Sequence, residues 1–196
     1  MFALVIEIAG QPDGEDAVRQ AHVRYSELAS RHPGILYKHV MHSRQDPARY
    51  FDVMVWARQN DSEAFGIDPE YQRHRPNQPI RIPTGPRAWL NPGYYREVWE
   101  VGSTTSGETG QLLGLYEVTP GKEAEFEAAA ATARDAIGGR VRSLILYRNL
   151  GKPNWYSIVA QGLAPGDEGV LAPLGTLTVR PPDLQRGDLI VRYDFR

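Results

Sequence analysis

The sequence of 196 residues contains no cysteine. Without a thiol the chain can form no disulfide, no thiolate zinc site and no iron–sulfur cluster, and it cannot use a cysteine nucleophile. An excess of one charge is also missing, because 22 lysines and arginines are interspersed with 24 aspartates and glutamates. Binding to a nucleic-acid backbone requires a basic patch or stripe, so we expect no nucleic-acid partner.

Long apolar runs and cofactor motifs are absent as well. No apolar run approaches the roughly 20 residues that span a bilayer, so we expect no membrane partner. The N-terminal stretch "MFALVIEIAG" includes Glu7 and lacks a basic leader, which predicts a strand and a cytoplasmic protein. The histidines lack the spacing of metal ligands and no glycine-rich phosphate loop occurs, so we expect no metal and no nucleotide.

The N-terminal half has the periodicities of a β-α-β-β-α-β unit. We expect strands at 2–9, 35–43, 50–58 and 94–101, and helices at 14–32 and 61–75. Asp13 is the expected N-cap of the first helix, and "HPG" at 32–34 ends that helix. Its expected buried stripe consists of Val18, Ala21, Tyr25, Leu28 and His32, and His22 is expected to be exposed.

The C-terminal half repeats this unit in outline. The same interval separates Glu7 from Glu117 and Tyr37 from Tyr147, and "ILYKH" is echoed by "LILYRN". The helix after Glu117 is expected to have Thr119 as N-cap and Pro120 as N1, and to bury Phe126, Ala130, Ala133 and Ile137. In 162–188, prolines and glycines are expected to break any second helix of this repeat.

The predicted fold class is α+β, with two tandem ferredoxin-like units packed sheet to sheet as an intramolecular α+β barrel. Each unit has helices on one face of its sheet, so the other face must be covered, and the second unit can cover it. We expect a first repeat at 1–101 with a complete site, a linker at 102–110, and a second repeat at 111–196 with a degenerate second helix. The protein would be a monomer built as a pseudo-dimer, or a weak homodimer.

The third strand of the first repeat, "YFDVMVWA", alternates between two faces. We expect Phe51, Val53 and Val55 to pack under the helices, and Tyr50, Asp52, Met54 and Trp56 to line a pocket. Aromatic walls with a few polar groups are typical of small-molecule pockets. The proline-rich segment 76–93 is the expected lid of this pocket, because long loops in compact domains are often lids.

Asp52 is the ionisable group of the predicted pocket. Burial would raise its pKa and make it a proton acceptor, whereas a place near the sheet edge would leave it solvated. The catalytic candidates are Asp52, Trp56 and Tyr50, and the substrate-binding candidates are Tyr37, His39, Met54, His74, Trp89 and Arg96.

The segment "RYFDVMVWARQNDSEAFGIDPEYQRHRP", following "HPGILYKHVMHSRQDPA", resembles the antibiotic biosynthesis monooxygenase (ABM) superfamily of ferredoxin-like dimeric α+β barrels. In that superfamily a strand ending in tryptophan leads into a short helix. The matching residues here are Trp56, Ser62, Ala64, Phe65 and Pro69, with about three extra residues after the tryptophan. The resemblance covers the first repeat well and the second in outline.

The resemblance implies several activities on one fold. Cofactor-free anthrone-type monooxygenases have an asparagine four residues before the tryptophan, where this chain has Asp52 before Trp56. The implied reaction deprotonates a small aromatic substrate, a phenol or anthrone of polyketide type, whose carbanion reduces dioxygen directly. No cofactor is then needed, and Asp52 would take or hold the proton, Trp56 would stack on the rings, and Tyr50 would donate a hydrogen bond.

Three alternatives remain open at this point. Haem-degrading members carry an asparagine on the first strand, where this chain has Ala3, Val5 and Glu7, and a haem-ligating histidine on the second helix, where it has His74. Polyketide cyclases share the fold, and a reduced flavin supplied by a partner would be a second cofactor alternative to haem. The other class is a small-molecule binding protein without catalysis.

Overall fold

The computed structural model describes residues 1–10, 13–74, 93–102 and 110–195. The N-terminal half contains β1 (Phe2–Ala9), α1 (Glu15–Ala29), β2 (Ile35–Ser43), β3 (Arg49–Trp56), α2 (Gln59–Gly66), α3 (Pro69–His74) and β4 (Gly93–Gly102). The C-terminal half contains β5 (Gly110–Glu117), α4 (Glu123–Ile137), a 3-10 turn (Gly138–Arg140), β6 (Ser143–Asn149), β7 (Trp155–Gln161), a 3-10 helix (Asp167–Leu177) and β8 (Asp183–Asp194). Nearly all of the predicted lid, including Trp89, lies outside the described residues.

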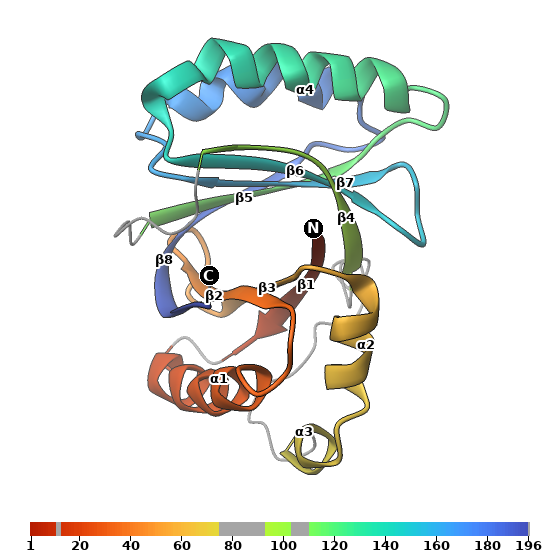
Figure 1. The fold of residues 1–196 in the computed structure, drawn as a ribbon. Helices are drawn as coiled ribbons and strands as arrows, with labels where there is room; N and C mark the ends of the chain where they lie inside the picture. The colour runs from red at the N-terminus through yellow and green to blue at the C-terminus, as the bar shows by residue number, and fades with distance from the viewer. Residues whose placement is uncertain (11–12, 75–92, 103–109, 196) are drawn as a thin grey trace. The chain divides into compact units, whose positions relative to one another are not determined.

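The element order confirms the predicted fold class of two tandem ferredoxin-like units (Figure 1). The hydrogen-bonded strand order, β1-β3-β2-β8-β5-β7-β6-β4, is that of a closed barrel. In the described part of the chain, no helix is both long and apolar enough to cross a membrane.

The chain divides into two compact units that do not follow the repeats at their last strands. Unit 1 consists of Met1–Tyr94 and Gly187–Arg196, and unit 2 consists of Tyr95–Arg186. In unit 1 the end of β8 pairs with β2, and in unit 2 most of β4 pairs with β6. Each unit therefore takes its last strand from the other repeat, and the repeat boundaries at 101 and 111 stay a prediction.

In unit 1, β3 is the central strand between β1 and β2, and its two faces are reversed relative to our prediction. Met54 and Trp56 lie in a buried cluster with Tyr25 of α1 and Phe65 of α2, so the even-numbered residues of β3 meet the helices. Val53 pairs with Val5 and His39 on the opposite face. Alternation separates the residues of a strand into two faces but does not say which face meets the helices. Both faces of β3 carry bulky side chains, and we assigned the face with the polar Asp52 to the side away from the helices, which was wrong.

The helix starts also differ from the prediction. The N-cap of α1 is Gly14, not Asp13, and the N-cap of α4 is Lys122, not Thr119. Before α4 the chain makes an extra turn, in which the Lys122 amide donates to the Thr119 carbonyl and Gly121 has φ of +87°. Only glycine adopts that conformation readily, so the turn delays the helix.

The predicted second helix of the first repeat is two short helices. The Asp68 carboxylate accepts hydrogen bonds from the backbone amides of Glu70 (2.7 Å) and Tyr71 (3.0 Å), which caps a new helix at Pro69. Proline at the first helical position after an aspartate cap is a common helix start. The result is a bend between α2 and α3 that brings Tyr71 back against Tyr25 of α1, with ring centroids 5.3 Å apart.

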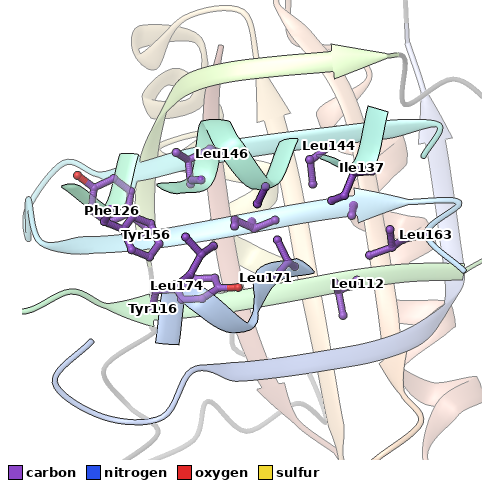
Figure 2. Close-up of a cluster of buried hydrophobic side chains, with 14 of the residues drawn as sticks. Leu112, Tyr116, Phe126, Ile137, Leu144, Leu146, Tyr156, Leu163, Leu171 and Leu174 are labelled. Carbon is purple, nitrogen blue, oxygen red and sulfur yellow. The ribbon is translucent and has the colours of Figure 1, made fainter. Parts of the chain in front are cut away.

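Unit 2 has an apolar core between α4 and its sheet (Figure 2). The predicted stripe of α4, which consists of Phe126, Ala130, Ala133 and Ile137, is buried there. The segment 167–177, predicted to contain no helix, forms a 3-10 helix that includes Pro173 and buries Leu171 and Leu174 in the same core. The 3-10 helix thus covers part of the sheet beside α4.

Replacing Phe126 by alanine should destabilise the protein by about 3–5 kcal/mol, because a large buried aromatic side chain is lost and a cavity remains. Phe126 has no exposed surface and contacts the rings of Tyr116 and Tyr156, with centroids 5.2 and 4.8 Å away. Chemical denaturation followed by circular dichroism measures the change. Thr132→Ala, on the exposed side of α4, is the control and should change stability by less than about 0.5 kcal/mol.

Candidate functional site

Three ionisable side chains from three elements meet between α1 and the sheet of unit 1. His22 comes from α1, Lys38 from β2 and Asp52 from β3, and their exposed fractions are 4%, 0% and 4%. His22 is buried because it lies four residues after Val18 and three before Tyr25, on the stripe that faces the sheet. The prediction that His22 is exposed was wrong.

The ammonium group of Lys38 joins the three side chains. Its Nζ lies 2.5 Å from Oδ2 of Asp52 and 2.9 Å from Nδ1 of His22, while Nδ1 and Oδ2 are 3.3 Å apart. An ammonium group can only donate, so Nδ1 of His22 accepts a hydrogen bond from Lys38. A neutral imidazole in this arrangement carries its proton on Nε2.

The charges of this cluster follow from burial and from the short contacts. Burial alone would raise the pKa of Asp52, but the charge of Lys38 and its short contact with the carboxylate lower it to about 2. Burial lowers the pKa of Lys38, and the negative charge of Asp52 opposes that change. Burial and the charge of Lys38 lower the pKa of His22. Asp52 is therefore ionised and His22 neutral, and our expectation that burial raises the pKa of Asp52 was wrong because it left out Lys38.

The cluster leaves buried polar atoms unused. His22 Nε2, Asp52 Oδ1 and Trp56 Nε1 are buried and have no hydrogen-bond partner among the described residues. A buried polar atom without a partner typically costs about 1–3 kcal/mol. Two donors and one acceptor are thus available to a ligand in this part of unit 1.

Aromatic rings and short helices surround Trp56. The ring of Phe65 lies 5.5 Å from that of Trp56 and 4.4 Å from that of Tyr71. Ion pairs hold α3 against α1, because Glu70 contacts Arg24 at 2.7 Å and Arg31 at 2.8 Å. The two short helices cover this part of unit 1, and the rings of Trp56, Phe65 and Tyr71 pack against one another there.

The other predicted site residues divide among several places. Met54 and Tyr50 share the face of Asp52, and Tyr50 stacks on His42 with centroids 4.3 Å apart. Tyr37 and His39 pair with Val55 and Val53, so they lie on the opposite face of the sheet. Of the remaining candidates, His74 is half-buried at the end of α3, and Arg96 is exposed and belongs to unit 2. Trp89 lies outside the described residues.

The opposite face of the sheet has its own buried ion pair. Arg49 donates to both carboxylate oxygens of Glu7, at 2.8 and 3.1 Å, and its guanidinium lies over the ring of Phe51. His39 Nε2 is 3.4 Å from the carboxylate of Asp194 on β8. We predicted that Tyr37 and His39 line the same pocket as Asp52, but these two side chains lie on the other face of the sheet.

Unit 2 lacks this cluster at the equivalent positions. Glu7 pairs with Phe51 and Glu117 pairs with Trp155, so the next residues, Asp52 and Tyr156, are equivalent. Tyr156 packs in the apolar core and donates a hydrogen bond to Glu127 at 2.7 Å. The three ionisable groups are a property of unit 1 in the described part of the chain.

Two members of the cluster were not predicted as site residues, and the sequence carries a signal for both. His22 follows Val18 by four residues and precedes Tyr25 by three, which is the spacing of a buried helical stripe. Lys38 directly follows Ile35, Leu36 and Tyr37 in a predicted strand, where a lysine that becomes buried needs a partner. The signal for Lys38 depends on knowing which strand face meets the helix.

The N-terminal part of the chain, which contains the cluster, is similar to a known family. Residues 1–77 match a family model described as antibiotic biosynthesis monooxygenase, which confirms the resemblance for the repeat that contains His22, Lys38, Asp52 and Trp56. No curated protein matches the chain.

Solved structures resemble the whole chain in fold. A proposed monooxygenase from Fusobacterium nucleatum has a TM-score of 0.77 at 10% identity, over 98% of this chain and 94% of that chain. An anthrone oxidase-like protein has a TM-score of 0.67 at 11% identity, over 99% and 93%. A proposed monooxygenase from Lactobacillus acidophilus has a TM-score of 0.66 at 10% identity, over 99% and 96%. At these identities the similarity establishes the fold.

Removing one member of the Lys38–Asp52 pair should destabilise the protein more than removing both. Lys38→Met or Asp52→Leu leaves a buried charge without its partner, at a cost of about 3–5 kcal/mol each. The double variant removes both charges and should cost less than either single change. Denaturant unfolding of the four proteins measures this cycle, and additive losses would show that the two groups do not interact.

Asp52 should make stability depend on pH in acid. Its pKa is about 2 in the folded protein against an ordinary value of 3.8. Because the folded value is the lower one, the contribution of Asp52 is present above pH ~4 and is lost as pH falls toward 2, on the order of 2 kcal/mol in total. Urea unfolding between these pH values should show a shallower pH dependence in Asp52→Asn. Asp16→Asn removes an exposed carboxyl of α1 and serves as control; an equal effect there would contradict the assignment.

Proposed function

We propose that unit 1 is a cofactor-independent monooxygenase that oxidises an aromatic, polyketide-type anthrone or phenol with dioxygen. The observation that carries the proposal is the buried His22–Lys38–Asp52 cluster with Trp56 on the same sheet face, in the repeat that matches the ABM family. Its unpartnered donors and acceptor are suited to the oxygen substituents of such a substrate. Asp52 and Trp56 lie four residues apart on β3, about 13 Å along the strand, which suits several fused rings.

The chemistry of the substrate balances without a further reductant. Conversion of an anthrone methylene to a carbonyl supplies four electrons, which reduce dioxygen completely. One oxygen atom enters the ring carbon, and the other leaves as water with the two hydrogens of the methylene. Loss of the first methylene proton puts negative charge on the ring system and its carbonyl oxygen, and this anion is the electron donor to dioxygen.

The protein groups would stabilise that anion. His22 Nε2–H and Trp56 Nε1–H are buried donors, and a hydrogen bond to a developing oxyanion is stronger in a buried site than in bulk water. Asp52, with its pKa near 2, is a weak base, so its role is to hold a substrate hydroxyl group at Oδ1. The methylene proton then passes to water. Tyr50 lies two residues from Asp52 on the same face, and burial raises its pKa, so it would remain a neutral hydrogen-bond donor.

Substrate entry requires the short helices to move. Trp56 and Lys38 have no exposed surface in this conformation. The contacts of α3 with α1 and its end are the ion pairs of Glu70 with partly exposed arginines, which each contribute little in water, and the packing of Tyr71 on Tyr25. Separation of α3 from α1 would open this site.

The haem alternative fits these residues poorly. β1 has Ala3, Val5 and Glu7 and no asparagine. The histidine buried in the helix–sheet space, His22, accepts a hydrogen bond from Lys38 at Nδ1, and its Nε2 carries the proton. Neither nitrogen is then free to ligate iron without breaking the cluster, so no reaction step is assigned to haem.

Oxygen uptake with an anthrone in metal-free, flavin-free buffer tests the proposal. The parent protein should consume dioxygen and form the quinone. Trp56→Phe keeps a buried ring and removes the Nε1 donor, so the rate should fall about 10- to 100-fold, as expected for loss of one donor to an oxyanion. The rate of His22→Gln should fall by a similar factor.

Trp99→Phe is the matched control, because Trp99 belongs to unit 2 and should leave the rate unchanged. Substrate consumption that persists without dioxygen would instead indicate a cyclase. Binding without any turnover would indicate a small-molecule binding protein, and both outcomes would overturn the oxygenase proposal.

A further inference from the structure

We propose that Lys38 is a positioning residue that fixes the proton of His22 on Nε2, so that His22 and Asp52 together recognise a hydroxyl group next to a carbonyl group on the substrate. This inference rests on the proposed function only for the location of the substrate. It assigns a substrate class, the hydroxy ketones whose two oxygens are ortho or peri to each other, and it gives Lys38 a role without contact to the substrate.

The first step is the bridge that Lys38 makes. Its Nζ has three N–H donors and no acceptor, and it lies within hydrogen-bond distance of His22 Nδ1 and Asp52 Oδ2. Both contacted atoms are therefore acceptors, although they lie only 3.3 Å apart. Without the ammonium group two acceptors at that distance would repel each other, and His22 would turn its proton to Nδ1 to donate to Asp52. Lys38 thus selects the tautomer.

The second step concerns the atoms that the bridge leaves over. Lys38 uses one nitrogen of His22 and one oxygen of Asp52, and the remaining Nε2 and Oδ1 are buried without a partner among the described residues. Nε2 belongs to the same small ring as Nδ1, Oδ1 belongs to the same carboxylate as Oδ2, and Nδ1 and Oδ2 are 3.3 Å apart, so the two remaining atoms lie in one small region of unit 1. One of these atoms is a donor and the other is an acceptor.

The third step concerns the ligand groups that would be complementary to the donor Nε2–H and the acceptor Oδ1. A carbonyl oxygen accepts from Nε2–H, and a neighbouring hydroxyl group donates to Oδ1. A methyl ether has no proton to donate, and an ionised phenol would set its charge against the Asp52 carboxylate. A site with a buried acceptor discriminates strongly against a ligand that cannot donate to it.

Unit 2 provides an internal contrast. Lys38 pairs with Met54, two residues after Asp52, and the equivalent pair in unit 2 is Leu146 with Ile158, two residues after Tyr156. The helix position that matches His22 on the buried stripe is Ala130. With an alanine and a tyrosine in these places, unit 2 offers no such donor–acceptor pair there. The proposed recognition belongs to unit 1.

The tautomer of His22 is measured directly by NMR of protein with nitrogen-15 in its histidines, with His22→Gln to assign the signals. In the parent, Nε2 should carry the proton and Nδ1 should not. In Lys38→Met the proton should move to Nδ1, and in Lys38→Arg, which keeps a buried donor, it should stay on Nε2. A proton on Nδ1 in the parent would overturn the proposal. That outcome is read from the parent protein alone, so it does not depend on the folding of the Lys38 variants.

Substrate selection is measured by anaerobic fluorescence titration with a dihydroxyanthrone and with its dimethyl ether. The parent should bind the dihydroxy compound about 10- to 100-fold more tightly, and Lys38→Met should reduce that ratio to near one. Lys122→Met, an exposed lysine of unit 2, should keep the parent ratio. Equal binding of the two compounds by the parent, or an unchanged ratio in Lys38→Met, would overturn the inference. Selective binding without oxygen uptake would overturn the proposed oxygenation and leave this inference standing.

Discussion

The contact of the Lys38 ammonium with Asp52 and His22 is the interaction on which unit 1 depends. It joins β2, β3 and α1 at one point, and all three groups are removed from water. Each buried charge would be very unfavourable alone, so the cluster is stable only while all its members keep their places. These hydrogen bonds restrict the position of α1 on its sheet more than apolar packing does, because apolar side chains tolerate small shifts.

The same contact connects packing with chemistry. The charge of Lys38 is balanced by Asp52, so the cluster adds no net charge to the helix–sheet space of unit 1. The directions of the remaining hydrogen bonds are set at the same time, because the ammonium group has already used one acceptor from each neighbour. Unit 2, with the same chain path, has an apolar core instead and is held together by side chains such as Phe126 and Leu174 (Figure 2). The first repeat thus contains a buried charged cluster, and the second has an apolar core at the equivalent positions.

Much of the fold could be predicted from the sequence, and part of the site could as well. Alternation and helical periodicity gave the strand order along the chain and the stripe of α4, because these patterns are local. The pair Asp52 and Trp56 was selected through its spacing in a family-like segment, and its role in a site stays a prediction. The orientation of β3 was missed, because it depends on which sheet face receives α1, a contact between residues distant in sequence. Lys38 and the low pKa of Asp52 were missed for the same reason, since the charge that lowers it comes from another strand.

The exchange of last strands has a consequence for how the molecule can be divided. A fragment that ends near residue 101 would include the whole family-model match, and also every member of the charged cluster. It would lack Gly187–Asp194, however, and the backbone of β2 would then form a bare sheet edge. An unpaired edge invites self-association, so expression of the N-terminal half alone would favour domain-swapped dimers or aggregates over an isolated working domain.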